Sequence, residues 1–109
     1  MPEKNLEQTE RFASMVAAKQ GWVLNPDAEF TRSLEEGLNL NWNRYGYYLC
    51  PCRDTLGSRA ADASVICPCA PSWKDVEETG QCYCALYLSP AFAASGDAPR
   101  SIPDRSGRD

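Results

Sequence analysis

The stretch Cys50-Pro51-Cys52 begins a pattern that occurs three times in this sequence. It returns as Cys67-Pro68-Cys69 and again as Cys82-Tyr83-Cys84. Fourteen residues separate the first two pairs, and twelve separate the last two. These pairs hold all six cysteines of a chain of 109 residues that contains no histidine. The chemistry of the chain therefore depends on thiols, and the fold has to bring three short segments together.

Six thiols without histidine restrict the kinds of site that the chain can form. A tetrahedral Cys₄ site uses four thiols and leaves two, which is the number that a redox disulfide requires. Structural zinc sites usually use a longer Cys-x₂₋₄-Cys spacing. In an extended Cys-x-Cys segment the two side chains point to opposite faces, so one thiol can face a cluster while the other faces elsewhere. The pattern favours an iron–sulfur cluster, and it leaves open a Cys₄ zinc module or a non-catalytic electron carrier.

The composition is typical of one globular domain that does not bind nucleic acid. The net charge is −4, and acidic and basic residues are mixed along the chain. Residues 1–4 lead into a polar stretch, and the longest uncharged run, 79–96, contains Gly80 and Pro90 and is too broken to span a bilayer. We therefore expect a cytoplasmic protein whose cysteines are reduced, metal-bound or catalytic. A secreted domain held by disulfides is the less favoured alternative.

Two helices are expected before the first cysteine pair, each with an apolar stripe at three- or four-residue spacing. The stripe of the first helix consists of Phe12, Met15 and Val16, and that of the second consists of Phe30, Leu34 and Leu38. Gly21 is expected to end the first helix. Asn25 is expected to cap the second, with Pro26 at its first position, and this helix should reach residues 39–43. Both helices are interpreted as scaffold.

Short elements are expected around the cysteines, in a small, mainly α domain. We predict a short helix within 55–65 and another over 71–78, capped by Ser72 and ended by Gly80. Leu86 and Leu88 fit either a helix or a strand. The aromatic residues before the first pair either pack beneath the loops or shield the cysteines from water. They are Trp42, Tyr45, Tyr47 and Tyr48. Residues 1–94 are expected to form the domain, and 95–109 a flexible tail.

The order of the three cysteine pairs resembles the catalytic chain of ferredoxin–thioredoxin reductase, and the resemblance covers roughly residues 10–90. It extends to neighbouring residues in several segments. They are Tyr45-Gly46, Cys50-Pro51-Cys52-Arg53, Ile66-Cys67-Pro68-Cys69 and Asp75-Val76-Glu77-Glu78-Thr79-Gly80-Gln81-Cys82-Tyr83-Cys84. The resemblance implies small helices and cysteine-bearing loops around a 4Fe–4S cluster next to a redox-active disulfide.

This resemblance also implies a role for each cysteine. The cluster ligands would be Cys50, Cys67, Cys69 and Cys82. The redox pair would be Cys52, which attacks the substrate disulfide, and Cys84, which resolves the mixed disulfide. The implied reaction is ferredoxin-dependent reduction of thioredoxin, with a ferredoxin-type donor and a thioredoxin-type acceptor. Three basic residues are candidate contacts for an acidic ferredoxin: Arg53, Arg59 and Lys74.

The sequence departs from the photosynthetic members of this family at one catalytic position. Those members have a histidine between the last two cysteines, where this chain has Tyr83. Imidazole exchanges protons near neutral pH, whereas a phenol normally acts there as a hydrogen-bond donor. Tyr83 is therefore expected to donate a hydrogen bond to sulfur. The tyrosine form resembles bacterial and archaeal relatives that usually lack the small variable partner chain, which favours a single-chain enzyme.

Overall fold

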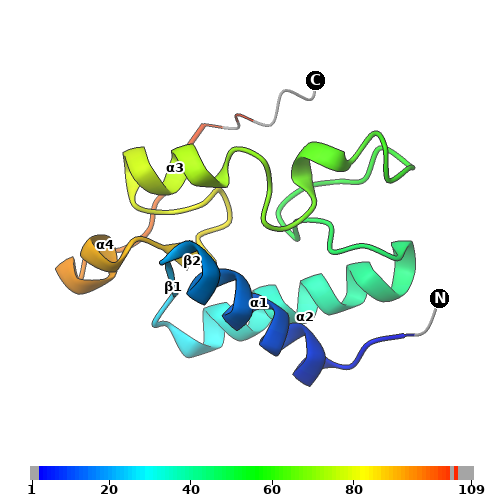
Figure 1. Cartoon of the computed structure of the whole chain (residues 1–109), viewed down its shortest axis with the longest axis horizontal. Coiled ribbons are helices and arrows are strands. Elements are labelled where there is room, and N and C mark those ends of the chain that lie inside the picture. Colours follow the sequence, from blue (N-terminus) through cyan, green and yellow to red (C-terminus); the bar gives the residue numbers. More distant parts are fainter. Residues whose placement is uncertain (1–2, 104, 106–109) are drawn as a thin grey trace.

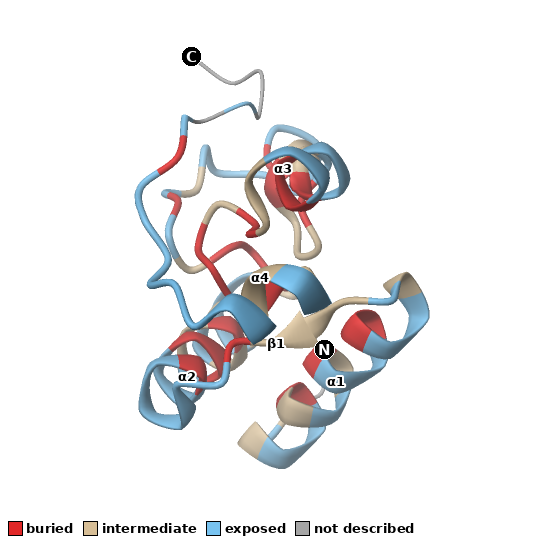
Figure 2. Ribbon diagram, turned by 90° about the vertical axis from the view of Figure 1, so that its left-hand side faces the viewer, coloured by how far each residue is buried: buried red, intermediate tan, exposed pale blue. Residues whose placement is uncertain are grey.

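Two long helices form one side of the molecule in the computed structural model, which describes residues 3–103 and 105 (Figure 1). Helix α1 spans Leu6–Gln20 and helix α2 spans Ala28–Tyr45, and the two pack against each other. Strand β1, Val23–Leu24, lies between them in the sequence. Buried residues lie along one side of each helix and exposed residues along the other (Figure 2). These helices are the support on which the cysteine loops lie.

The second half of the chain consists of loops and short elements. These are the 3₁₀ helix η1 (Ala63–Val65), helix α3 (Ser72–Thr79), strand β2 (Tyr87–Leu88) and helix α4 (Pro90–Ser95). Strand β2 pairs with β1 in an antiparallel sheet of two strands, so that Val23 lies opposite Leu88. This pairing joins the segment after the third cysteine pair to the connection between α1 and α2. The predicted fold class, a small and mainly α domain, is confirmed.

Helix α1 begins and ends as its local sequence requires. The Asn5 side chain accepts a hydrogen bond from the Gln8 N–H, and Gln8 accepts one in return from the Asn5 N–H, which forms a capping box. Gly21 ends the helix with a φ of 76°, as predicted. Met15 is 60% exposed, so its predicted place in the apolar stripe is wrong. Smaller residues form the buried face: Thr9, Ala13, Val16 and Ala17.

Helix α2 is capped two residues later than predicted. Asp27 is the cap, because its carboxylate accepts a hydrogen bond from the Phe30 N–H at 3.1 Å. The predicted cap, Asn25, instead accepts from the Asp27 N–H at 2.9 Å, and its amide donates to the Ala85 carbonyl at 3.1 Å. Phe30 is 39% exposed, whereas Leu34 is buried as predicted. Asn25 therefore ties the start of α2 to the loop after the third cysteine pair.

Several shorter elements also differ from their prediction. Within residues 55–65 only η1 is helical, because the side chain of Asp62 organises the preceding residues as a loop. Ser72 begins α3 but does not cap it, since its hydroxyl contacts the Cys69 sulfur instead. Gly80 ends α3 as predicted, with a φ of 82°. Leu88 lies in a strand, which settles the helix-or-strand alternative, and α4 follows it without having been predicted.

Residues after α4 run back along the molecule. The Gln81 side chain donates to the Arg100 carbonyl at 2.7 Å and accepts from the Arg100 N–H at 2.9 Å, and Ile102 is buried. The predicted flexible tail, 95–109, includes positions 104 and 106–109, which lie outside the described residues. Its boundary and flexibility remain predictions. Among the described residues, no helix combines the length and the apolar character needed to cross a membrane.

Candidate active site at the three cysteine pairs

The first cysteine pair lies directly on helix α2. Gly37 belongs to that helix, and a Cβ atom added to it would lie 2.9 Å from the Cβ of Pro51. The absence of a side chain at Gly37 therefore lets the Cys50-Pro51-Cys52 segment approach the helix backbone. The Cys50 N–H donates to the Val65 carbonyl at 2.9 Å. These contacts fix the first pair between α2 and η1.

The second pair is joined to the first through the backbone. The Cys67 N–H donates to the Tyr48 carbonyl at 2.7 Å, and Leu49 forms an isolated antiparallel bridge with Ile66. Cys50 and Cys67 each directly follow a residue of this bridge, so the first two cysteine pairs begin side by side. Of the aromatic residues before the first pair, Tyr47 and Tyr48 are buried, and the ring of Tyr48 stacks on that of Phe12 in α1 at 4.3 Å between centroids, whereas Tyr45 is exposed. Packing was one of the two interpretations offered by the sequence.

The loop after Cys52 is organised by one buried carboxylate. Asp62 accepts hydrogen bonds from the Tyr47 hydroxyl at 2.5 Å, the Thr55 hydroxyl at 2.6 Å and the Leu56 N–H at 2.8 Å. The hydrogen bond to Asp62 raises the pKa of Tyr47 above its ordinary value. A carboxylate with this many donors is well compensated for its burial. Asp62 thereby closes the loop that leaves Cys52 at the surface.

The third pair lies in a tight turn beside strand β2. The Cys82 N–H donates to the Tyr87 carbonyl at 3.0 Å, and the Ala85 N–H donates to the Cys82 carbonyl at 2.9 Å. Ala85 has a φ of 63°, which non-glycine residues seldom adopt. The hydrogen bond from Asn25 to the Ala85 carbonyl supports this conformation. The turn directs the side chains of the third pair toward the first pair.

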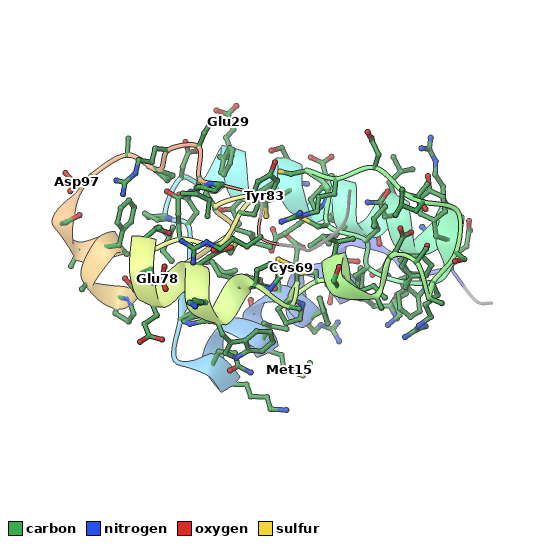
Figure 3. All side chains as sticks on the ribbon, turned by 90° about the horizontal axis from the view of Figure 1, so that it is seen from above. Met15, Glu29, Cys69, Glu78, Tyr83 and Asp97 are labelled. Carbon is green, nitrogen blue, oxygen red and sulfur yellow. The ribbon has the colours of Figure 1, made fainter. Side chains whose placement is uncertain are left out.

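The three cysteine pairs come together in the fold, and Cys69 and Tyr83, from two of the loops, both lie near the middle of the molecule in Figure 3. All six cysteines, each within the described residues, are free thiols, and the Sγ atoms of Cys82 and Cys84 are 3.9 Å apart. Cys50, Cys82 and Cys84 belong to the main buried cluster, and Cys67 packs against it. Cys69 is also buried, whereas Cys52 is exposed. Five thiols thus face the interior and one reaches solvent.

The thiols differ in acidity because their surroundings differ. Hydrogen bonds from Cys50 and Cys84 lower the pKa of Cys52 to about 4. Hydrogen bonds with Cys50, Cys52 and Cys82 raise the pKa of Cys84 well above its ordinary value. Burial raises the pKa of Cys69 to about 11, and it raises that of Cys67 well above its ordinary value, because the Cys67 sulfur is enclosed although the residue is half-buried. In the free-thiol state, Cys52 is therefore more acidic than Cys84, Cys69 and Cys67.

Several polar groups surround the buried sulfurs. The Tyr87 N–H donates to the Cys82 sulfur at 3.3 Å, and the Tyr87 hydroxyl lies 3.3 Å from the Cys67 sulfur. The Ser72 hydroxyl lies 3.0 Å from the Cys69 sulfur. Sequence reasoning missed both residues, although Ser72 stands only three positions after Cys69. Hydrogen bonds to sulfur are among the features that set the potential of an iron–sulfur centre.

The donor set fits an iron–sulfur cluster. It consists of buried thiols from three loops, with hydroxyl and amide groups directed at the sulfurs. As the side chains stand in the described residues, no three Cys, Asp or Glu groups are arranged to hold a single metal ion. A cluster is larger than one ion and accepts thiolates from several loops. The arrangement thus brings together all the cysteines singled out from the sequence, while the role of each remains a prediction.

Tyr83 and Arg53 contact each other, and within the described residues the Tyr83 hydroxyl makes no hydrogen bond to a cysteine sulfur, contrary to the expectation. Tyr83 is half-buried, and the guanidinium carbon of Arg53 lies 4.0 Å from the centre of its ring. Arg53 is only 9% exposed, so its predicted role as a surface contact for ferredoxin is wrong. It follows Cys52 and turns inward to the third cysteine loop. Arg59 and Lys74 are exposed, as that role requires.

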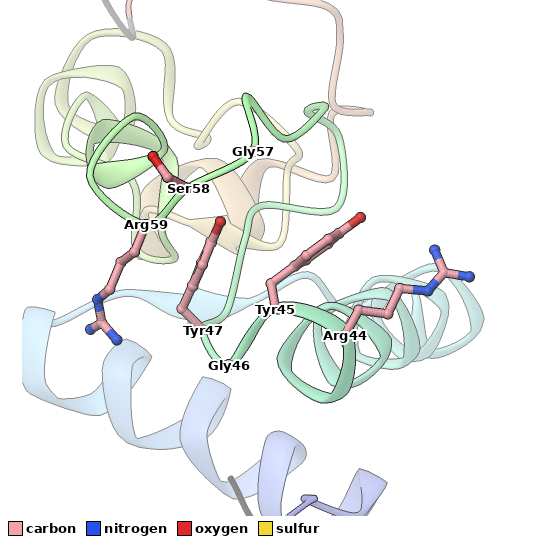
Figure 4. Close-up of a pocket in the computed structure, with 7 residues that line it drawn as sticks. All are labelled: Arg44, Tyr45, Gly46, Tyr47, Gly57, Ser58 and Arg59. Carbon is pink, nitrogen blue, oxygen red and sulfur yellow. The ribbon is translucent and has the colours of Figure 1, made fainter.

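One pocket lies away from the cysteines, between the end of α2 and the loop 57–59 (Figure 4). Its volume is about 520 Å³, and no cysteine lines it. Arg44 and Arg59 contribute to its wall, but the Arg44 side chain extends away from the other lining residues (Figure 4). A substrate disulfide carried by a protein requires an exposed sulfur rather than an enclosed pocket. The candidate active site is therefore the cysteine centre.

Comparisons of the sequence with known proteins identify one family. The family model described as "Ferredoxin thioredoxin reductase catalytic beta chain" matches residues 1–103. The catalytic chain of ferredoxin-thioredoxin reductase from Pyropia yezoensis is 33% identical, over 80% of this chain and 73% of its own length. The Cyanidium caldarium chain is 33% identical over 87% and 84%, and that of a Synechocystis species is 31% identical over 92% and 82%. This chain belongs to the ferredoxin–thioredoxin reductase catalytic chain family.

Proposed function

We propose that this protein reduces thioredoxin-type disulfides with electrons from a ferredoxin-type donor, at a 4Fe–4S cluster beside a redox pair of cysteines. Members of its family bind an iron–sulfur cluster. The observation that carries the proposal is that, of the six thiols in the described residues, five are buried or half-buried, whereas Cys52 is exposed. Such a division supplies both ligands for a buried centre and a sulfur that a protein substrate can reach.

Four thiols are proposed to hold the cluster: Cys50, Cys67, Cys69 and Cys82. When bound, the cluster would supply electrons one at a time, as the ferredoxin-type donor delivers them. The residues around these thiols have a distinct task. The Tyr87 N–H and the hydroxyls of Tyr87 and Ser72 lie against three of the four sulfurs and can stabilise their negative charge. The surrounding apolar side chains keep water away from them.

The other two thiols are proposed to reduce the substrate. The Cys52 thiolate attacks one sulfur of the acceptor disulfide, forming a bond to it while the acceptor S–S bond breaks and its second sulfur leaves as a thiolate. Cys84, after losing its proton, then attacks the Cys52 sulfur of this mixed disulfide. The Cys52–Cys84 bond forms and the first acceptor sulfur leaves, so two electrons have passed to the acceptor. Both acceptor thiolates take up protons. Two electrons from the donor and two protons from water then restore the dithiol.

The proposal is tested on protein purified without oxygen. We expect iron and inorganic sulfide in equal amounts, a brown chromophore absorbing near 400 nm, and reduction of thioredoxin that requires reduced ferredoxin. Zinc in place of iron, or iron and sulfide without thioredoxin reduction, would contradict the proposal and indicate a metal module or an electron carrier. Size measurement of the active protein tests the further prediction that one chain suffices. The cytoplasmic location also stays a prediction.

A further inference from the structure

The contact between Arg53 and Tyr83 joins two cysteine loops. Arg53 follows Cys52 in the sequence, and Tyr83 precedes Cys84, so the two side chains belong to the immediate neighbours of the proposed redox pair. The guanidinium carbon lies 4.0 Å from the ring centre of Tyr83. Arg53 is only 9% exposed and Tyr83 is half-buried. A guanidinium over an aromatic face is attracted to it more strongly when water is partly excluded.

The contact is present while the two sulfurs are not bonded to each other. All six cysteines are free thiols in this structure. Once the covalent bond between Cys52 and Cys84 has opened, other contacts have to keep the two loops together. The backbone contacts of Cys50 and Pro51 fix the beginning of the first loop, but Cys52 itself is exposed at its outer end. Arg53 reaches from this end directly to the third loop.

We propose that Arg53 is a positioning residue, which holds the Cys52 thiol beside Cys84 after reduction by stacking on Tyr83. This inference rests on the proposed function, because it takes these two cysteines as the redox pair. Closing a disulfide within one chain depends on the effective concentration of one thiol at the other. By limiting the separation of the loops, the stack raises this concentration. The stack therefore speeds the attack of Cys84 on the mixed disulfide, which releases the acceptor.

The chain supplies a matched control for Arg53 in the same loop. The guanidinium carbon of Arg59 lies 5.9 Å from the ring centre of Tyr47, and Arg59 is exposed. Arg59→Gln therefore removes the same charge and the same kind of group from the loop without touching the contact with Tyr83. At Tyr83, a change to Phe keeps the ring and a change to Leu removes it. Together with Arg53→Lys, which keeps a positive charge beside Cys52, these variants separate stacking from charge and from general packing.

The test measures the equilibrium between the cysteine pair and dithiothreitol in the anaerobically purified, cluster-containing protein. In this exchange the Cys52 and Cys84 thiols form a disulfide, and their two electrons and two protons reduce oxidised dithiothreitol. Alkylation of the remaining thiols followed by mass spectrometry gives the disulfide fraction. We expect Arg53→Gln to lower the equilibrium constant for disulfide formation about three- to tenfold. Arg59→Gln should leave it within twofold of the wild type.

The other variants show whether stacking is the cause. Tyr83→Leu should lower the constant as much as Arg53→Gln, the double variant no further, and Tyr83→Phe, which keeps the ring, should lower it less than Tyr83→Leu. The equilibrium constant of Arg53→Lys should lie between those of Arg53→Gln and the wild type. If Arg53→Gln does not fold, Arg53→Lys provides the test in its place. Equal losses in Arg53→Gln and Arg59→Gln, or no loss in either, would overturn the inference alone. Absence of any disulfide between Cys52 and Cys84 in the wild type would overturn the proposed function with it.

Discussion

Residues 6–45 and residues 47–89 are held together in different ways. The first region is two helices with internal backbone hydrogen bonds, side-chain caps and a shared buried face. The second contains one helix of eight residues, η1 and a strand of two residues, and it depends on single hydrogen bonds between separate segments. The buried sulfurs lie in this second region. The comparison indicates that a bound cluster would stabilise mainly the cysteine region, while the helices retain their own support.

Loss of a proposed cluster ligand should have the largest effect. We expect a Ser substitution at each of four positions to remove nearly all iron and sulfide from the protein: Cys50, Cys67, Cys69 and Cys82. Amide hydrogen exchange should then increase strongly over residues 47–89 and much less over α1 and α2. Full iron and sulfide in any one of these variants would refute the assignment of that cysteine. Equal loss of protection in both regions would refute the comparison.

The redox pair should show a different result, because its two cysteines are not proposed as ligands. Cys52→Ser and Cys84→Ser should both keep iron and sulfide, and each should reduce thioredoxin at least about a hundredfold more slowly. Cys84→Ser should accumulate a covalent mixed disulfide with thioredoxin, whereas Cys52→Ser should not, since serine is a far poorer nucleophile. Mass spectrometry of the trapped complex checks this. Trapping by the Cys52 variant instead would reverse the two roles.

The contact between helix α2 and the Cys50-Pro51-Cys52 segment, where the two regions meet, should be disturbed by one added methyl group at Gly37. An Ala at position 37 would favour helix α2 by up to about 1 kcal/mol through its helix propensity. Its Cβ would, however, lie 2.9 Å from Pro51, and overpacking costs about 1–3 kcal/mol. We therefore expect Gly37→Ala to lower the free energy of unfolding by about 1 kcal/mol and to weaken cluster retention.

Unfolding in denaturant checks this expectation, when it is monitored by the helical circular dichroism and by the absorbance of the cluster. Glu36→Ala, at the exposed neighbouring position of the same helix, is the matched control and should leave iron content unchanged. A Gly37→Ala protein that is more stable than the wild type and keeps its cluster would show that the Cys50-Pro51-Cys52 segment moves freely away from α2. The second region would then be less dependent on the first than the structure indicates.

The two regions also differ in how far the sequence predicts them. Helices α1 and α2 follow from local signals, such as Gly21 after the last turn and the spacing of Leu34 and Leu38. The errors there are small and have local causes. Asn25 was expected to cap α2, but tertiary contacts occupy its side chain, and Asp27 caps the helix instead.

In the cysteine region, pattern reasoning predicted which residues matter but not how they are placed. The six cysteines were recognised from their spacing and from the family resemblance. The roles of Ser72 and Tyr87 beside the sulfurs depend on contacts between loops, which leave no periodic signal in the sequence. Arg53 looked like a surface charge, because its inward direction depends on the position of Tyr83, thirty residues away in the chain.

The smallest effect is expected at Tyr83, where this chain departs from the photosynthetic members of its family. Tyr83→Phe keeps the ring, and hence the stacking on Arg53, and deletes only the hydroxyl. If Tyr83 serves as a hydrogen-bond donor beside the redox pair, the loss should be about 0.5–1.5 kcal/mol, or roughly a two- to tenfold slower reduction of thioredoxin. Folding and iron content should be unchanged.

A histidine at the same position provides the contrasting case. Imidazole titrates near pH 6.5, so Tyr83→His should remain active and acquire a step in its pH–rate profile between about pH 6 and 7. The wild type and Tyr83→Phe should both lack this step, because neither has an imidazole at position 83. The profiles of all three forms, measured with the same thioredoxin, decide the matter. A loss of a hundredfold or more in Tyr83→Phe, or a step in the wild type that disappears in that variant, would mean that the tyrosine transfers a proton. Tyr83 would then act as an acid or base in the reaction, in addition to providing the ring on which Arg53 stacks.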